Sequence, residues 1–217
     1  MDFITMNYSF RKKNKTVKYI IIHYTGMIDF NSAYRKLNDL KSEVSCHYLV
    51  SREGKIYNLL CPKFKGWHAG ISEWKNVKNL NDYSIGIELE NKGHEFGYTN
   101  FTDRQYHGTK KLIKFLKFNF SIKDKDIVFH SDIAPNRKKD PGEKFLLKKL
   151  ELERFYSYQK KITSIEELLK KYGFSHNYIK LYKSDCIKAV KRSMNYKTID
   201  SSVSKTFKNK FINLLFK

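Results

Sequence analysis

A short apolar stretch, VKYIIIH at residues 17–23, predicts a buried strand that ends in a histidine. Its β-branched residues favour extended backbone, and an uninterrupted apolar run is typical of a strand covered on both faces. A second run, DIVFH at residues 126–130, also ends in a histidine. Ligands of open α/β sheets usually bind at the carboxyl ends of the strands. The two runs therefore place His23 and His130 where a functional site is expected.

The segments around these runs predict helices as well as further strands. The clearest amphipathic helix is FTDRQYHGTKKLIKFLKFNF at residues 101–120, because Thr102 as N-cap and Gln105 three positions later form a capping box. A shorter helix is predicted in NSAYRKLNDLKSE, with Asn31 or Ser32 as its N-cap.

Two other segments alternate or run apolar in the manner of strands. HYLVSREGKIYNLL (47–60) predicts two strands around a turn at residues 52–54, and YSIGIELEN (83–91) predicts one more. We therefore expect an α/β fold in which a mixed central β-sheet is flanked by helices.

The pattern changes after about Leu150, where only helical periodicity remains. The segment ITSIEELLKKYGF (162–174) predicts an amphipathic helix with Ser164 as N-cap and Gly173 as its end, and two more helical patterns follow it. We expect residues 1–150 to form one domain and residues 151–217 a small helical bundle.

The chain is strongly basic, with a formal net charge of +21. One explanation is an anionic partner such as nucleic acid, a membrane surface or an acidic cell-wall polymer. The other is a bias toward residues with AT-rich codons. We favour the second for most of the charge, because the lysines are spread along the whole chain instead of gathering with arginine and aromatic residues. We therefore expect no nucleic-acid partner.

The sequence as given predicts neither export nor a membrane span. The run YIIIHY is far too short to cross a bilayer, and no long apolar segment follows the basic N-terminal residues. The cysteines Cys46, Cys61 and Cys186 form an odd, widely spaced set, which is unlike a disulfide framework. These features favour a cytoplasmic location; the periplasm or cell envelope is the alternative if an export signal was removed or is of an unusual kind.

Three side chains have the chemistry of a catalytic zinc site. Such sites use three protein ligands and leave a fourth position open. His23 and His130 end their strands, and Asp140 follows in the proline-flanked loop HSDIAPNRKKDPG (130–142). Two imidazoles and one carboxylate favour zinc, and the carboxylate leaves the ion a good Lewis acid. The alternative is that each histidine is a hydrogen-bonded core or surface residue.

Five segments then occur in an order that is typical of one enzyme family. They are IIHYTG (21–26), SCHYLVSREGKIYNL (45–59), GWHAGIS (66–72), NDYSIGIELEN (81–91) and HSDIAPNRKKDPG (130–142). Together they resemble the zinc-dependent N-acetylmuramoyl-L-alanine amidases of the amidase_2 type, nearest to AmpD- and AmiD-like enzymes and related to peptidoglycan recognition proteins. The resemblance covers roughly residues 15–150. In pattern alone, the C-terminal segment resembles the small helical domain of AmiD-type enzymes, which implies that the predicted bundle is either a peptidoglycan-binding module or a stabilising tail.

The resemblance implies zinc ligation by His23, His130 and Asp140. It also implies Glu88 and Lys138 as catalytic residues. A carboxylate at Glu88 would take a proton from the attacking water and return it to the leaving amine, while Lys138 would stabilise the oxyanion. Glu90, two residues along the same strand, is the competing assignment for the carboxylate.

The resemblance also places Trp67 and His68 in the substrate groove, and the side-chain chemistry of Arg52, Asn91 and Arg137 makes them further candidates for substrate contacts. An indole can pack against a sugar ring, and a guanidinium can pair with the carboxylates of a stem peptide. The residues alone allow another explanation, in which the tryptophan and histidine are core residues and the arginines belong to the surface.

We therefore expect a zinc hydrolase that cleaves the amide bond between N-acetylmuramic acid, in its ordinary or its 1,6-anhydro form, and L-alanine of peptidoglycan or soluble muropeptides. The alternative is a non-catalytic peptidoglycan-binding protein on the same fold. The sequence leaves open the choice between intact wall and muropeptide, the preferred stem peptide, and the oligomeric state.

Overall fold

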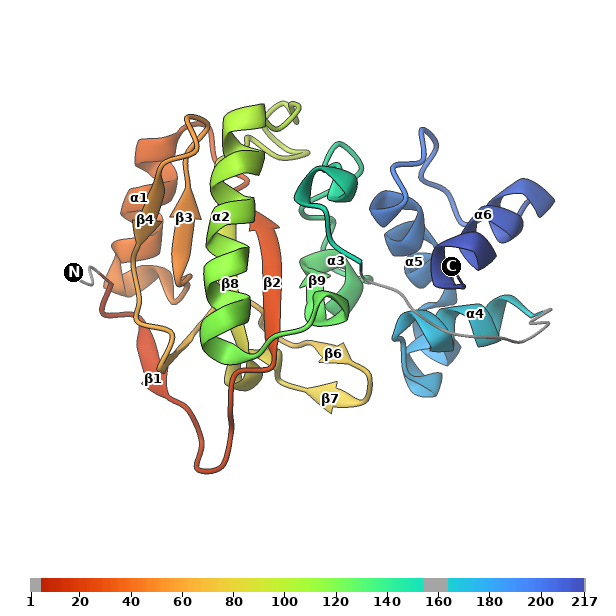
Figure 1. Ribbon diagram of the computed structural model, residues 1–217, viewed down its shortest axis with the longest axis horizontal. Helices are drawn as coiled ribbons and strands as arrows, with labels where there is room; N and C mark the ends of the chain where they lie inside the picture. Colours follow the sequence, from red (N-terminus) through yellow and green to blue (C-terminus); the bar gives the residue numbers. More distant parts are fainter. Residues whose placement is uncertain (1–4, 154–163, 217) are drawn as a thin grey trace.

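The computed structural model describes residues 5–153 and 164–216. Its centre is a five-stranded sheet with the strand order β4-β3-β8-β2-β9 (Figure 1). These strands are β2 (Tyr19–Tyr24), β3 (Tyr48–Val50), β4 (Ile56–Asn58), β8 (Ser84–Leu89) and β9 (Ile127–Phe129). Every neighbouring pair is parallel except β3 and β4, which are antiparallel. The predicted α/β fold with a mixed central sheet is confirmed.

Strand β2 lies inside the sheet, between β8 and β9, because its residues can be buried on both faces. Ile20, Ile21 and Ile22 are all 0% exposed. Ile20 and Ile22 pack in the cluster beneath helix α2 (Asp103–Phe120), whereas Ile21 belongs to the cluster on the opposite side. Since side chains alternate along a strand, His23 falls on the side of Ile21, away from α2.

The helix boundaries show one confirmed prediction and one that was wrong. Helix α2 begins with the predicted capping box, in which the hydroxyl of Thr102 accepts the N–H of Gln105 and the Gln105 side chain accepts the N–H of Thr102. Helix α1 (Phe30–Asn38) starts before the predicted caps, because the carboxylate of Asp29 accepts the N–H of Ser32. Asp, Asn and Ser are all good N-caps, so a run that contains all three does not fix the first residue.

The end of the last strand also differs from the prediction. Strand β9 ends at Phe129, and His130 is the first residue of the short helix α3 (His130–Ile133). The sequence did not predict several short elements, namely β1 (Tyr8–Phe10), β5 (Phe64–Gly66), β6 (Glu73–Trp74), β7 (Val77–Lys78) and the 3-10 helices η1 (Leu40–Ser42), η2 (Leu80–Tyr83), η3 (Asp124–Asp126) and η4 (Leu147–Leu150).

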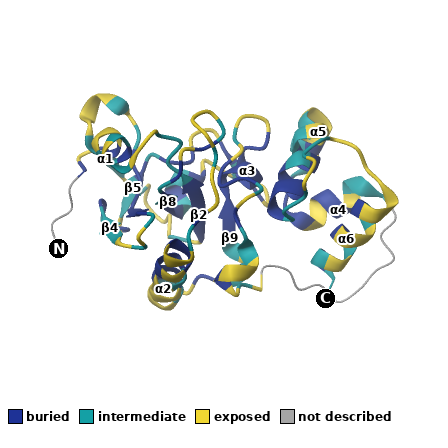
Figure 2. Cartoon of the chain, turned by 90° about the horizontal axis from the view of Figure 1, so that it is seen from above, coloured by how far each residue is buried: buried dark blue, intermediate teal, exposed yellow. Residues whose placement is uncertain are grey.

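Three C-terminal helices lie beside the β9 edge of the sheet (Figures 1 and 2). They are α4 (Ile165–Tyr172), α5 (His176–Ser193) and α6 (Lys205–Leu215). Ser164 caps α4 and Gly173 ends it, as predicted. The boundary between domains at residue 150 stays a prediction, and residues 154–163, which include the start of the predicted segment 162–174, lie outside the described residues. In the described ranges, no helix has both the length and the apolar character that crossing a bilayer requires.

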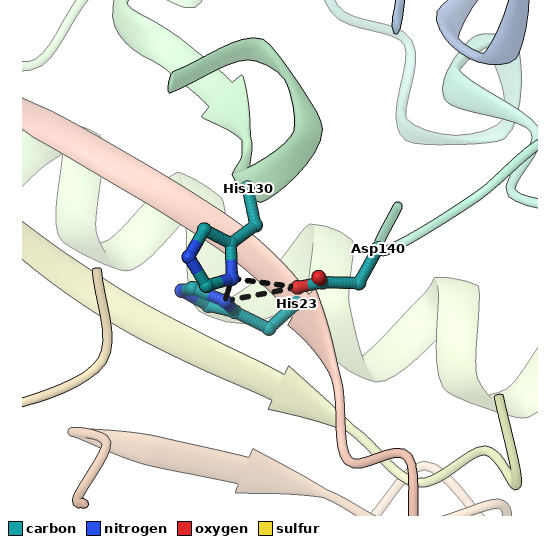
Figure 3. Close-up of side chains that lie close together, drawn as sticks. All are labelled: His23, His130 and Asp140. Atoms are coloured by element: carbon teal, nitrogen blue, oxygen red, sulfur yellow. Dashed lines mark hydrogen bonds and ion pairs between the residues drawn. The ribbon is translucent and has the colours of Figure 1, made fainter. Parts of the chain in front are cut away.

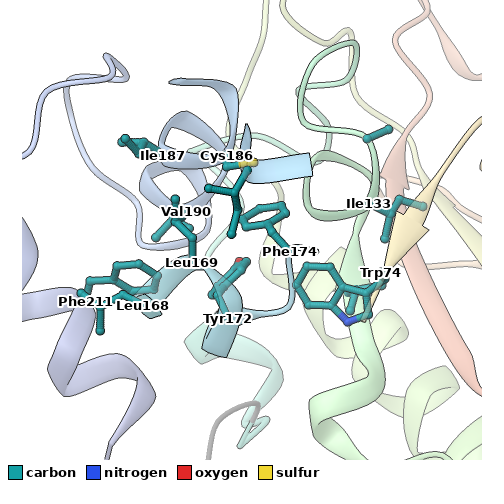
Figure 4. Packing of buried hydrophobic residues seen from close by; sticks show 14 of the residues in the cluster. Trp74, Ile133, Leu168, Leu169, Tyr172, Phe174, Cys186, Ile187, Val190 and Phe211 are labelled. Carbon is teal, nitrogen blue, oxygen red and sulfur yellow. The ribbon is translucent and has the colours of Figure 1, made fainter. Parts of the chain in front are cut away.

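These helices share one hydrophobic cluster with the sheet instead of enclosing a core of their own. The cluster runs from Ile21 in β2 through Trp74 in β6 to Tyr172 in α4 and Phe211 in α6. Figure 4 shows Trp74, Tyr172 and Phe211 within it. The helix end at Gly173 packs directly on the indole, where a Cβ atom would lie 2.4 Å from Trp74 Cζ2. Only glycine fits this contact, which joins the C-terminal helices to the β6–β7 hairpin.

Candidate metal centre

Three side chains from distant segments converge on one point (Figure 3). Nδ1 of His23 lies 2.8 Å from Nδ1 of His130, and Oδ2 of Asp140 lies 3.1 and 3.0 Å from these two nitrogens. All three residues are buried. Around an ion with tetrahedral ligand bonds of about 2.0–2.2 Å, neighbouring donor atoms lie about 3.3–3.6 Å apart. The observed triangle is close to the spacing of a metal-ligand set.

The loop from His130 to Asp140 returns to its starting point, which explains why ligands ten positions apart become neighbours. The N–H of Ser131 donates to the carbonyl of Asp140 at 2.9 Å. The N–H groups of Arg137 and Lys138 both donate to the carbonyl of Ala134, at 3.1 and 3.0 Å. These backbone bonds close the loop and bring its two ends together.

Hydrogen bonds from the C-terminal segment also hold the two ends of this loop. The hydroxyl of Tyr172 donates to Oδ1 of Asp132 at 2.7 Å, two residues after the first ligand of the loop. The side-chain amide of Asn195 donates to the carbonyls of Glu143 and Phe145, both at 2.7 Å, just after the second ligand. Both ends of the ligand loop are therefore attached to the C-terminal segment, one through Tyr172 in α4 and the other through Asn195, just after the end of α5.

The second ring nitrogen of each histidine faces a hydrogen-bond acceptor. Nε2 of His130 lies 3.3 Å from the carbonyl oxygen of Ala69, and Nε2 of His23 lies 3.0 Å from Nδ1 of His68. A carbonyl can only accept, so His130 carries its proton on Nε2 and presents a lone pair on Nδ1. With His23 donating to His68 in the same way, two imidazole lone pairs and a carboxylate face one another. This is a donor set that a cation satisfies, so the residues fit a metal ion.

The electrostatics favour the deprotonated ligand forms that metal binding requires. Burial, assisted by the nearby His130, lowers the pKa of His23 to about 4. Burial alone would raise the pKa of Asp140, but His130 and His23 outweigh it, and the pKa of this carboxyl is lowered. At neutral pH the centre therefore holds a neutral imidazole at His23 and a charged carboxylate at Asp140.

Glu88 reaches the centre from β8, where it pairs in parallel register with His23. Its Oε2 atom is buried and has no hydrogen-bond partner within residues 5–153 and 164–216. Burial and the charge of Asp140 raise the pKa of Glu88 well above its usual value, although Lys138 opposes the shift. Glu90 lies elsewhere, beyond the end of β8, where its carboxylate accepts the N–H of Arg52 at 2.8 Å.

A cavity of about 390 Å³ opens beside the ligands. Its lining includes Glu88, Lys138 and three of the predicted substrate contacts, Trp67, His68 and Arg137. The other two predicted contacts are held in hydrogen bonds elsewhere. The guanidinium of Arg52 donates to the Thr99 hydroxyl at 3.2 Å, and the amide of Asn91 donates to the Thr99 carbonyl at 2.9 Å.

Sequence reasoning missed a polar group at the side of the cavity. The Tyr24 hydroxyl lies 2.8 Å from Nδ1 of His94, whose Nε2 lies 3.2 Å from Glu143. Burial, with the charge of Asp140 second, raises the pKa of Tyr24 to about 12. The sequence could have indicated Tyr24 as a site residue, because it directly follows His23 in the same strand. The partners of Tyr24 come from other segments and carried no such signal.

Comparison with known proteins agrees with this geometry. Residues 13–143 match the family described as N-acetylmuramoyl-L-alanine amidase. The chain belongs to this amidase family. The family is metal-dependent, and His23, His130 and Asp140 are the residues of this family member that could hold the ion.

Individual members of the amidase family show the extent of the similarity. AmiD of Escherichia coli K12 is 39% identical over 141 residues, which are 59% of this chain and 50% of that protein. The 1,6-anhydro-N-acetylmuramyl-L-alanine amidase AmpD of Haemophilus influenzae is 39% identical over 103 residues, 47% of this chain and 54% of that one. The chain thus spans about half the length of these relatives.

One solved structure extends the comparison beyond the part that the family description covers. It is the complex of E. coli AmiD with the substrate anhydro-N-acetylmuramic acid-L-Ala-D-gamma-Glu-L-Lys, with a TM-score of 0.74 and 28% identity. The match covers 91% of this chain and 88% of that chain, so it extends past residue 143 into the region of helices α4, α5 and α6.

Proposed function

We propose that this protein hydrolyses the amide bond between the lactyl group of N-acetylmuramic acid and L-alanine, with zinc held by His23, His130 and Asp140. The observation that carries the proposal is the triangle of donor atoms, 2.8–3.1 Å apart, in a family of N-acetylmuramoyl-L-alanine amidases. When bound, zinc acts as a Lewis acid toward the scissile carbonyl.

The residues around the ligands have the chemistry for the proton transfers. Glu88 takes a proton from the water that attacks the carbonyl carbon, and then gives it to the nitrogen of L-alanine as the C–N bond breaks. Burial raises the pKa of Glu88, which makes its carboxylate a stronger base toward this water. The ammonium of Lys138, which lines the same cavity, stabilises the negative charge on the oxygen of the tetrahedral intermediate. The products are a muramoyl sugar and a free stem peptide.

We infer that the substrate is a muropeptide, in view of the relatives' names and the anhydromuropeptide bound to AmiD. The cavity lining carries Lys36, Arg137 and Lys139, whose positive charges suit the carboxylates of a stem peptide. Trp67, whose indole N–H donates to the Ser9 hydroxyl at 2.9 Å, lines the same cavity and offers an aromatic surface to a sugar. A cytoplasmic location remains our prediction from the sequence.

The decisive experiment is mass spectrometry of products from zinc-loaded protein given either anhydromuropeptide or intact sacculi. We expect release of the free peptide, with loss of release after chelation and recovery with added zinc. Glu88→Gln should lower kcat/KM by about 10²–10⁴-fold, the usual contribution of a proton-transfer group. Glu90→Gln is the matched control, and its hydrolysis should stay near wild type. Tight binding of these substrates without any cleavage would refute the proposal and favour a recognition protein.

A further inference from the structure

His68 lies beneath the metal ligand His23 in a closely fitted position. It is 9% exposed, and its ring meets the ring of His23 edge to face, with centroids 5.1 Å apart. It covers Gly86 of β8, where a Cβ atom would lie 2.5 Å from Cγ of His68. On its other side the ring of His47 stands 5.5 Å away. The imidazole of His68 is therefore confined to one place and one orientation.

The hydrogen bonds around His68 determine which of its nitrogens carries the proton. The hydroxyl of Ser84 donates to the carbonyl of Leu80 at 2.6 Å, so its one proton is already used. Nε2 of His68 lies 3.4 Å from this hydroxyl oxygen, which can then only accept. His68 is therefore protonated on Nε2 and presents a lone pair on Nδ1.

This lone pair in turn fixes the tautomer of the ligand. Nδ1 of His68 lies 3.0 Å from Nε2 of His23 and can only accept, so His23 carries its proton on Nε2. Nδ1 of His23 is then the free nitrogen that faces His130 and Asp140. A chain of three hydrogen bonds, which ends on a backbone carbonyl, thus orients the donor atom of His23.

The neighbouring residue performs the same task for the second histidine. The carbonyl of Ala69 faces Nε2 of His130 at 3.3 Å. The backbone that carries both acceptors is held by one side chain, because Oδ1 of Asn81 accepts the N–H of His68 at 3.1 Å and that of Ala69 at 2.7 Å.

We propose that His68 is a positioning residue, which fixes the tautomer and orientation of His23 for metal binding. The inference rests on the proposed function only in assuming that a metal binds at these residues. Residues that orient a metal-bound histidine typically contribute 10–100-fold in metal affinity.

The test compares two variants of nearly equal shape, His68→Asn and His68→Leu. The amide oxygen of asparagine takes the place of Nδ1 and can still accept from His23, whereas leucine cannot. The zinc Kd of the full chain is measured in competition with a chromophoric chelator, and the visible spectrum of the cobalt-loaded protein reports ligand geometry. We expect His68→Leu to raise the Kd by about 10–100-fold with an altered cobalt spectrum, and His68→Asn to stay within a few-fold of wild type.

Two outcomes would overturn the proposal: a Kd for His68→Leu within a few-fold of wild type, or equal weakening in both variants. If His68→Leu does not fold by circular dichroism, His68→Gln replaces it, because its amide reaches the Nε2 position instead of Nδ1 and should also weaken binding. Without that weakening the proposal fails as well. The zinc Kd and the cobalt spectrum are measured without substrate, so they test His68 separately from catalysis. A wild-type protein that binds zinc here but cleaves no muropeptide in the activity assay would refute the amidase proposal and leave this one standing.

Discussion

The hydroxyl of Tyr172 gives a sharp test of whether the C-terminal helices stabilise the ligand loop. Tyr172 and Asp132 are both 0% exposed, so no solvent can replace their 2.7 Å hydrogen bond. The same hydroxyl lies 2.8 Å from Oγ of Ser193 in α5. Tyr172→Phe removes this hydroxyl while keeping the ring in the cluster around Trp74.

The magnitude follows from the hydrogen bond to Asp132 that is lost. A hydrogen bond to a charged group contributes about 1.5–3 kcal/mol, so the free energy of unfolding should fall by about that amount. In a protein of this size each kcal/mol corresponds to about 2–4 °C, which predicts a decrease in Tm of about 3–12 °C.

A matched control is available in the same cluster. The hydroxyl of Tyr196 is buried and has no hydrogen-bond partner within the two described ranges of the chain. Tyr196→Phe deletes the same atom but leaves no partner unsatisfied, so its Tm should equal or exceed that of wild type. Both variants would be measured by differential scanning calorimetry on the metal-free protein. Equal Tm values for the two variants would refute the reasoning.

Three further perturbations test other features of the chain. Glu88→Gln should stabilise the metal-free protein at pH 7, because the raised pKa means that folding opposes ionisation of this carboxyl. This gain in the free energy of unfolding should vanish below pH 4.5, where the carboxyl is protonated in the folded and the unfolded protein, and urea titrations at the two pH values check this. Gly173→Ala should lower stability by more than Gly97→Ala, since both have positive φ but only the first Cβ would collide with a neighbour; a thermal melt showing equal losses would contradict the packing argument. Lys138→Met should lower kcat by about 10²–10³-fold in steady-state kinetics, with zinc affinity unchanged, whereas Lys148→Met, at an exposed position outside the cavity lining, should have little effect on kcat.

Local sequence patterns predicted the elements that carry the site, because their causes are local. The apolar β-branched run that became β2 can be buried on both faces whatever its neighbours are. The capping box of α2 and the end of α4 at Gly173 depend on residues at most a few positions apart. Where several good caps adjoin, as at the start of α1, the pattern was ambiguous and the predicted caps were wrong.

The sequence could not distinguish the roles of two residues of the same type within one motif. Glu88 and Glu90 stand two positions apart, and only the structure separates them, because β8 ends between them and the second carboxylate turns to the N–H of Arg52. The role of His68 also depended on the structure. Its motif suggested a substrate contact, whereas its nearest hydrogen-bond partner is His23, 45 positions away.

The sequence by itself determined the central strand, the main helices and the residue types available for a metal centre, since periodicity, capping and ligand chemistry act over short distances along the chain. The tertiary structure decided which side chains meet. The donor triangle, the orientation of His23 by His68 and the attachment of the ligand loop to Tyr172 all join residues 10 to 117 positions apart. Contacts over such separations depend on sheet order and helix packing, which no local pattern encodes.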